Sequence, residues 1–131
     1  MRDAYPQFQI LGIDVGAVTF GNPETTDRFC MHHDAPFACF ADPARRAYDA
    51  FGLSCNPSVF TLAHPRGWPA FFRAVRRGRK PFKGRLSVRQ MPGAFLIDSA
   101  GELRYEHRNR YPADNPPLEE LLAAAAATSR A

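Results

Sequence analysis

The chain has few cysteines, almost no lysine and no long apolar run, and each shortage narrows what it can be. Three cysteines in 131 residues are too few for a disulfide framework, so we expect a cytoplasmic protein kept in a reducing environment. No apolar run approaches the roughly 18–20 residues of a membrane span, and residues 1–7 contain no apolar core of a secretory signal. Lysine occurs twice against 15 arginines, a bias typical of a GC-rich bacterial genome.

Positive charge gathers in one segment. The formal net charge is +4, but residues 64–97 hold nine basic residues and no acidic one, while the rest of the chain holds 8 basic and 13 acidic residues. The sequence pI of 9.3 therefore describes one segment and argues only weakly for nucleic acid. Apolar residues make up 45% and charged residues 23%, which is globular composition, and we expect one domain over residues 1–131.

Hydrophobic periodicity and helix-start signals predict an α/β order of elements. Residues 8–18 are apolar at nearly every position, as in a strand buried on both faces. Asn22-Pro23 and Asp42-Pro43 each offer an N-cap followed by a proline at the first helical position. The predicted elements are a strand over 8–18, a helix over 23–33, a strand over 36–40, a helix ending at Gly52, a hairpin of 93–98 and 102–108, and a helix that opens at residues 115–118.

Residues 54–92 form an irregular basic insert before the hairpin. Within it Trp68, Phe71, Phe72 and Val75 follow helical spacing, which predicts a short amphipathic helix whose other face is arginine. Three interpretations of the basic segment stay open. The aromatic side chains pack on the domain while the arginines stay in water, or residues 66–89 bind an acidic protein or nucleic acid, or they lie on an anionic membrane surface.

Several of these segments resemble one family. Residues 95–105 read FLIDSAGELRY and resemble the "FVID-x-x-G-x-(I/L)-R-Y" hairpin of AhpC/TSA-type peroxiredoxins. Residues 40–43 and 48–53 are similar to that family's "LSDP…Y-x-x-Y-G-L" unit, and residues 107–122 are similar to the ending of its peroxiredoxin-like branch. The resemblance covers roughly residues 2–126 and implies a thioredoxin-like three-layer fold with thiol-dependent reduction of peroxides.

The resemblance also implies what this chain lacks. In the family the reactive cysteine lies at the start of the first core helix, just after the first core strand. This sequence begins at what looks like the end of that helix, so we expect an N-terminally truncated domain without a peroxidatic cysteine and a poor peroxidase. The alternative function is a non-enzymatic binding module built on residues 66–89.

The strand expected to be missing is central, between residues 8–18 and 93–98. Its absence would leave two strand edges without hydrogen-bond partners. Three explanations stay open: a mis-assigned start, direct pairing of the two strands, or a strand borrowed from a second copy. A homodimer through these edges is therefore an expected assembly, and a thiol reductant protein is an expected partner.

The candidate site residues are few. Cys55, after a helix stop, is the cysteine expected to be exposed, either with a resolving role or as a bystander; Cys30 and Cys39 are predicted to be small core residues. Pro92 resembles the cis-proline that faces the reactive cysteine in thioredoxins.

Arg89 and Arg108 could polarise a peroxide oxygen, as an arginine does in the family, or could be solvated surface charges. The cysteines and histidines fit no zinc spacing and the glycines no G-x-G-x-x-G pattern, so neither a metal nor another cofactor is expected.

Overall fold

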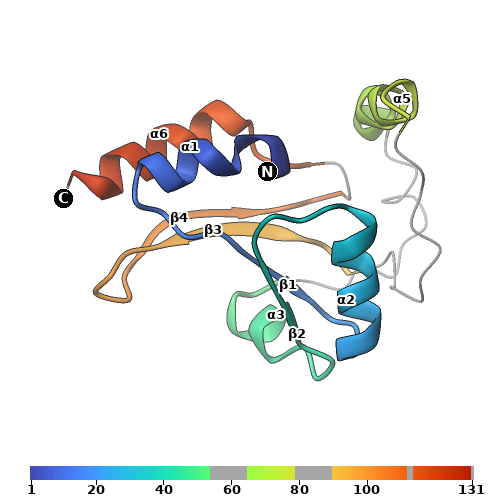
Figure 1. Ribbon diagram of the computed structural model, residues 1–131, viewed down its shortest axis with the longest axis horizontal. Coiled ribbons are helices and arrows are strands. Elements are labelled where there is room, and N and C mark those ends of the chain that lie inside the picture. The colour runs from blue at the N-terminus through green and yellow to red at the C-terminus, as the bar shows by residue number, and fades with distance from the viewer. Residues whose placement is uncertain (54–64, 79–89, 112–113, 131) are drawn as a thin grey trace.

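The computed structural model describes residues 1–53, 65–78, 90–111 and 114–130, and its helices and strands alternate as in an α/β protein (Figure 1). The elements in chain order are η1 (Arg2–Ala4), α1 (Tyr5–Ile10), β1 (Gly16–Thr19), α2 (Pro23–His32), β2 (Ala38–Ala41), α3 (Arg46–Ala50), η2 (Pro65–Gly67), α5 (Trp68–Arg76), β3 (Gly93–Ile97), β4 (Leu103–Arg108) and α6 (Leu118–Ser129).

The predicted strand over 8–18 is wrong in its first half. Residues 5–10 form α1, with a proline in its first turn, and Phe8 is 3% exposed. Gly12, at φ 71°, ends this helix, and the Ile13 amide donates to the Phe8 carbonyl 2.9 Å away. Only residues 16–19 remain extended. An apolar run of this length suits a buried helix as well as a buried strand, and contacts with α6 stabilise the helix.

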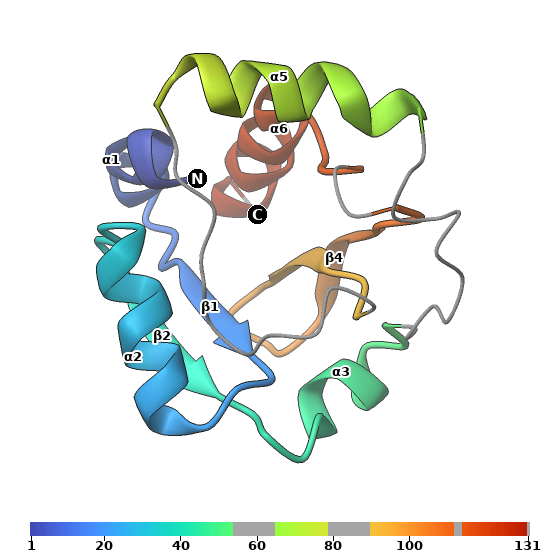
Figure 2. The same ribbon diagram turned by 90° about the vertical axis from the view of Figure 1, so that its right-hand side faces the viewer.

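The strands form two separate sheets in the described part of the chain. β1 and β2 are parallel, with Val18 opposite Phe40, and β3 and β4 are antiparallel. Direct pairing of the first strand with the hairpin, one of the three explanations above, therefore does not occur. Figures 1 and 2 both place β1, not β2, nearer to the hairpin. This arrangement agrees with the thioredoxin-like strand order, in which the central strand lies between β1 and β3.

The helix start at Asn22-Pro23 is confirmed, whereas the start predicted at Asp42-Pro43 is wrong in position, because α3 begins at Arg46 with Arg45 as its N-cap. The Asn22 side chain accepts a hydrogen bond from the Thr25 amide at 2.8 Å, directly before α2. The Asp42 carboxylate accepts from the amides of Arg46 and Ala47, at 3.0 and 2.8 Å, as α3 begins. These caps orient the two helices that flank the β1–β2 sheet.

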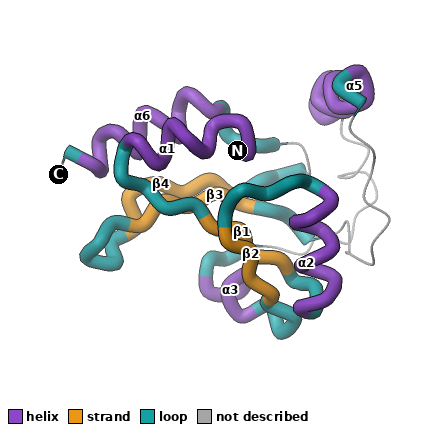
Figure 3. The backbone as a smooth tube through the Cα atoms, viewed as in Figure 1, coloured by secondary structure: helices purple, strands orange, loops and turns teal. Residues whose placement is uncertain are grey.

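The hairpin and the last helix are also confirmed. The Asp98 carboxylate accepts from the amides of Ala100 and Glu102 across the turn, each at 2.9 Å. α6 lies beside α1 above the hairpin in the tube view (Figure 3). The core joins these elements: Ala4, Phe8 and Ala125 are buried, with Leu96 and Leu121 packed against them.

The amphipathic helix predicted in the basic insert exists as α5, but its packing differs from the first interpretation above. Trp68 is 59% exposed and Phe72 60% exposed, so neither side chain is buried. Among the elements described, α5 makes its main contacts with η2, and Figure 1 shows it set apart from the strands. No helix in the described ranges is both long and apolar enough to cross a membrane.

Candidate functional site

A disulfide bond joins Cys30 and Cys39. Cys30 lies in the last turn of α2 and Cys39 on β2, with Cα atoms 6.7 Å apart, and both residues are half-buried. The prediction that they are separate core residues is therefore wrong. α2 packs on β2, so inward-facing residues of the two elements meet. The expected packing of this helix on the following strand was the signal that could have paired Cys30 with Cys39.

The turn inside the disulfide loop is a Schellman turn with a non-glycine residue at its left-handed position. Asp34 has φ 49°. The Ala35 amide donates to the Cys30 carbonyl at 3.0 Å, and the Asp34 amide donates to the Met31 carbonyl at 3.2 Å. Aspartate tolerates this backbone region better than most residues but still at a steric penalty. The disulfide thus closes a loop that contains a strained turn.

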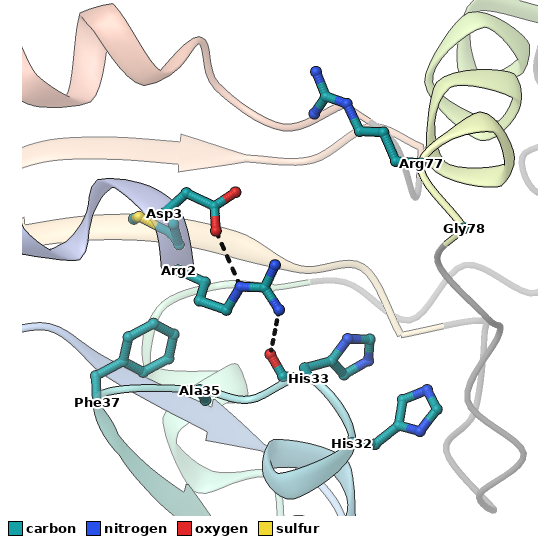
Figure 4. A pocket seen from close by; sticks show the side chains of 9 residues that line it. Arg2, Asp3, His32, His33, Ala35, Phe37, Arg77 and Gly78 are labelled. Carbon is teal, nitrogen blue, oxygen red and sulfur yellow. Dashed lines mark hydrogen bonds and ion pairs between the residues drawn. The ribbon is translucent and has the colours of Figure 1, made fainter.

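A cavity of about 540 Å³ lies next to this loop. Its walls are η1, the end of α2 with the following turn, and the end of α5. Figure 4 shows the Arg2 side chain between η1 and the α2 turn, where Arg2 donates to the Asp3 carboxylate at 3.0 Å and to the His33 carbonyl at 3.4 Å. The Arg77 side chain comes from the α5 side. Sequence reasoning missed this cavity, since Arg2 and Arg77 are far apart in the chain and belong to no motif.

The residues proposed from the sequence do not gather in this cavity. Cys55 and Arg89 lie outside the described residues. Pro92 is exposed, and its carbonyl accepts a hydrogen bond from the Asn109 amide at 3.0 Å. No peptide bond between described residues is cis, so the Met91–Pro92 bond is trans and the likeness to a thioredoxin cis-proline does not extend to it.

Arg108 braces the end of the hairpin. Its Nε donates to the Phe51 carbonyl at 2.7 Å, its Nη1 lies 3.1 Å from the Glu106 carboxylate, and its guanidinium stacks over the Phe95 ring at 5.5 Å. Gly52 follows Phe51 with φ 66°, a left-handed backbone conformation that glycine adopts without strain. The contacts thus tie β4 to the end of α3.

The titratable groups with shifted pKa values lie in structural contacts rather than at the disulfide. The backbone amide of Glu102, then the Arg104 guanidinium, lower the pKa of Asp98. Hydrogen bonding from the Arg110 amide lowers the pKa of Asp114. Burial, then the hydrogen bond to Glu120, raise the pKa of Tyr105 to about 12.

Tyr48 is the shifted group nearest to the β1–β2 sheet. Its hydroxyl donates to the Val18 carbonyl at 2.8 Å. Burial, and then the negative charge of Asp42, raise its pKa. Within the described ranges no three histidine, cysteine or acidic side chains come together as metal ligands would.

Comparison with known families identifies the chain. Residues 1–111 match the family described as AhpC/TSA antioxidant enzyme. The chain belongs to this family. A search of curated proteins gave no match. The family resemblance read from the hairpin and the Asp42-Pro43 unit is thus confirmed.

Membership in the AhpC/TSA family decides the fold and the broad function. The family is thioredoxin-like, and the mixed helices and small sheets agree with that fold. It also supports a peroxiredoxin-like thiol-redox function. Among the described residues, Cys30 and Cys39 are joined in a disulfide.

Proposed function

We propose that this chain is a peroxiredoxin-like thiol-redox domain that is weak or inactive as a peroxidase through its own 131 residues. The observation that carries this proposal is the Cys30–Cys39 disulfide. A peroxide is attacked by a thiolate, and neither sulfur is a thiolate while this bond is closed. When a reductant opens the bond, the positions of the two cysteines still disfavour the thiolate.

The positions of these two cysteines also favour the proposal. Reactive thiolates are stabilised at helix N-termini or beside cations. Cys30 instead lies in the last turn of α2, where the helix dipole disfavours an anion, and Cys39 lies within a strand. Cys55 stays a proposed redox residue. Arg89 and Arg108 stay candidates to polarise a peroxide oxygen, and Pro92 stays a candidate site residue beside the hairpin.

A hydrogen peroxide consumption assay tests the proposal. The full chain is incubated with peroxide and either dithiothreitol or a thioredoxin system, and an active peroxiredoxin serves as positive control. We expect turnover close to the protein-free background. Fast turnover by the full chain would overturn the proposal. Turnover that also survives Cys30→Ser, Cys39→Ser and Cys55→Ser, each made singly, would show that none of these cysteines is the reactive one.

A binding function of residues 66–89 is the second candidate, and the exposure of Trp68 and Phe72 favours it. Both aromatics accompany Arg73 and Arg76 on α5, a combination that suits acidic proteins, single-stranded nucleic acid or an anionic membrane surface. Retention on heparin that falls with salt, and is lost in the Arg73→Gln, Arg76→Gln double variant, would support it. If the wild-type chain elutes at the same salt concentration as this variant, the binding function is contradicted.

We also propose a homodimer through the sheet edges, a thiol reductant protein as a partner, and a bacterial, cytoplasmic setting. In the described residues β1 pairs only with β2 and β3 only with β4, and Val18 and Phe40 are 44% and 56% exposed. Because the basic segments of two copies repel each other, a dimer should hold them apart and should not dissociate in added salt. Light scattering at two salt concentrations tests this, and a monomer of 14.6 kDa at both would exclude the dimer.

A further inference from the structure

The helix of the basic segment carries apolar and cationic side chains and little else. α5 reads WPAFFRAVR, which contains no acidic residue, no hydroxyl and no amide side chain. Residues 65–78 together hold four arginines and no acidic residue. Apart from the indole N–H of Trp68, the side chains of α5 can therefore offer a partner only apolar contact and positive charge.

The exposed apolar side chains and the arginines occupy different parts of this helix. Trp68 and Phe72 are four residues apart, so they lie on one face, and both are more than half exposed. With about 3.6 residues per turn, Arg76 lies about 60° and Arg73 about 120° from the middle of that face. An exposed aromatic stripe is thus bordered by two cations whose long side chains can reach past it.

α5 lies on the outside of the molecule in both ribbon views (Figures 1 and 2). Among the elements described, its main contacts are with η2. The cavity described above is lined by Arg77 and Gly78 at this end of the chain segment, and by neither Trp68 nor Phe72. The aromatic pair therefore belongs to an outer helix face and not to the wall of that cavity.

The charge of the chain is divided in a way that would orient it. Residues 64–97 hold nine basic residues and no acidic one, and the rest of the chain holds 8 basic and 13 acidic residues. An anionic surface attracts the part that contains α5 and repels the remainder. Contact with such a surface is therefore favoured through α5.

We propose that α5 binds the surface of an anionic lipid bilayer, with Trp68 and Phe72 in the interfacial region and Arg73 and Arg76 at the level of the lipid phosphates. The proposal rests on the proposed binding function of residues 66–89 and names its partner. A helix with an apolar stripe and flanking arginines lies in the plane of a membrane interface. Tryptophan is favoured there because its ring is apolar and its N–H is polar.

The other two partners of the binding function need chemistry that α5 lacks. A protein interface carries about one hydrogen bond per 100–200 Å², but the polar side chains of α5 are limited to arginine and the Trp68 indole. Single-stranded nucleic acid is held in a basic groove that follows its backbone, whereas Trp68 and Phe72 lie on an outer helix face. A bilayer surface requires only apolar contact and positive charge.

Trp68 is the only tryptophan of the chain, so its fluorescence reports on this face directly. The full chain is titrated with vesicles of phosphatidylcholine alone, or of equal parts of phosphatidylcholine and phosphatidylglycerol. With the anionic vesicles we expect the emission to shift to shorter wavelength, quenching by acrylamide to fall, and the protein to sediment with the lipid. Neutral vesicles should give none of these changes, and 0.5 M salt should weaken the binding.

Charge variants test the part played by the arginines. The Arg73→Gln, Arg76→Gln double variant should bind anionic vesicles about 10–30-fold more weakly, since each basic residue near an anionic surface contributes a factor of about five. The Arg28→Gln, Arg46→Gln double variant removes the same charge from exposed positions on α2 and α3 and is the matched control. It should bind nearly as well as the wild type.

Aromatic variants test the part played by the apolar face. Phe72→Ser should weaken binding severalfold, whereas Phe40→Ser, which removes an exposed aromatic side chain from β2, should not. Circular dichroism confirms that each variant folds.

The outcomes separate the membrane from the binding function in general. Equal binding to neutral and anionic vesicles, an unshifted Trp68 emission on anionic vesicles, or equal losses in a variant and its control would overturn the membrane proposal. A chain that binds heparin, polyglutamate or a single-stranded oligonucleotide but not anionic vesicles keeps the binding function and excludes the membrane. If the chain binds none of these, both proposals fail.

Discussion

Removing the Cys30–Cys39 disulfide should lower the stability of the fold by an amount that follows from the size of its loop. The bond closes a loop with a sequence separation of 9, and the chain-entropy relation gives about 2.7 kcal/mol for a loop of roughly ten residues. For a chain of this size that corresponds to a drop in Tm of about 10 °C. The value is an upper bound, because structure retained by the reduced, unfolded chain lowers the entropy that the bond removes.

Thermal unfolding followed by circular dichroism measures this effect. The samples are the oxidised protein, the protein in dithiothreitol, and the Cys30→Ala, Cys39→Ala double variant. We expect the last two to melt together, both well below the oxidised protein. Cys55→Ala is the control and should leave the shift between oxidised and reduced protein intact. If oxidised and reduced protein melt within about 2 °C of each other, the bond contributes nothing to stability and the reasoning fails.

Three further predictions concern the local features that shape the fold. Asp34→Gly should stabilise the protein by about 1 kcal/mol, because glycine adopts φ 49° without strain and the lost ion pair with Arg2 is exposed and weak. Equilibrium urea unfolding measures this gain, which Asp34→Ala should not show. Asn22→Ala should destabilise the protein by about 1 kcal/mol in the same assay through loss of the α2 cap, and an unchanged midpoint would contradict the cap's role. Because the folded-state pKa of Asp98 is below its ordinary value of 3.8, its contribution is present above pH 3.8 and is lost as pH falls through the folded value. Asp98→Asn should therefore flatten the acid limb of a Tm–pH curve, and a limb as steep as in the wild type would refute this.

Local signals of the sequence predicted those elements that local interactions determine. The start of α2 follows from the capping side chain of Asn22, which acts within three residues, whereas α3 begins three residues after the predicted Pro43. The hairpin follows from alternation and from Asp98, which bonds to its own turn. In each case the interaction that stabilises the element is contained in the stretch of sequence that predicts it.

Features that depend on contacts between distant segments were not predictable in the same way. Residues 8–18 are apolar whether they form a helix or a strand, and α1 is helical because Phe8 packs against Ala125, more than 100 residues away. The cavity depends on η1 and α5 meeting near the end of α2. The disulfide is an intermediate case, because its two cysteines are close in sequence but meet only when α2 packs on β2.

The disulfide loop is the place where stability and chemistry are most directly connected. Left-handed backbone at Asp34 costs about 1 kcal/mol, less than the roughly 2.7 kcal/mol that closing the loop contributes, so the oxidised protein can keep the strained turn. When the bond is reduced, that margin is lost in the segment that forms one wall of the cavity. The redox state of Cys30 and Cys39 therefore acts on a turn that lines the cavity.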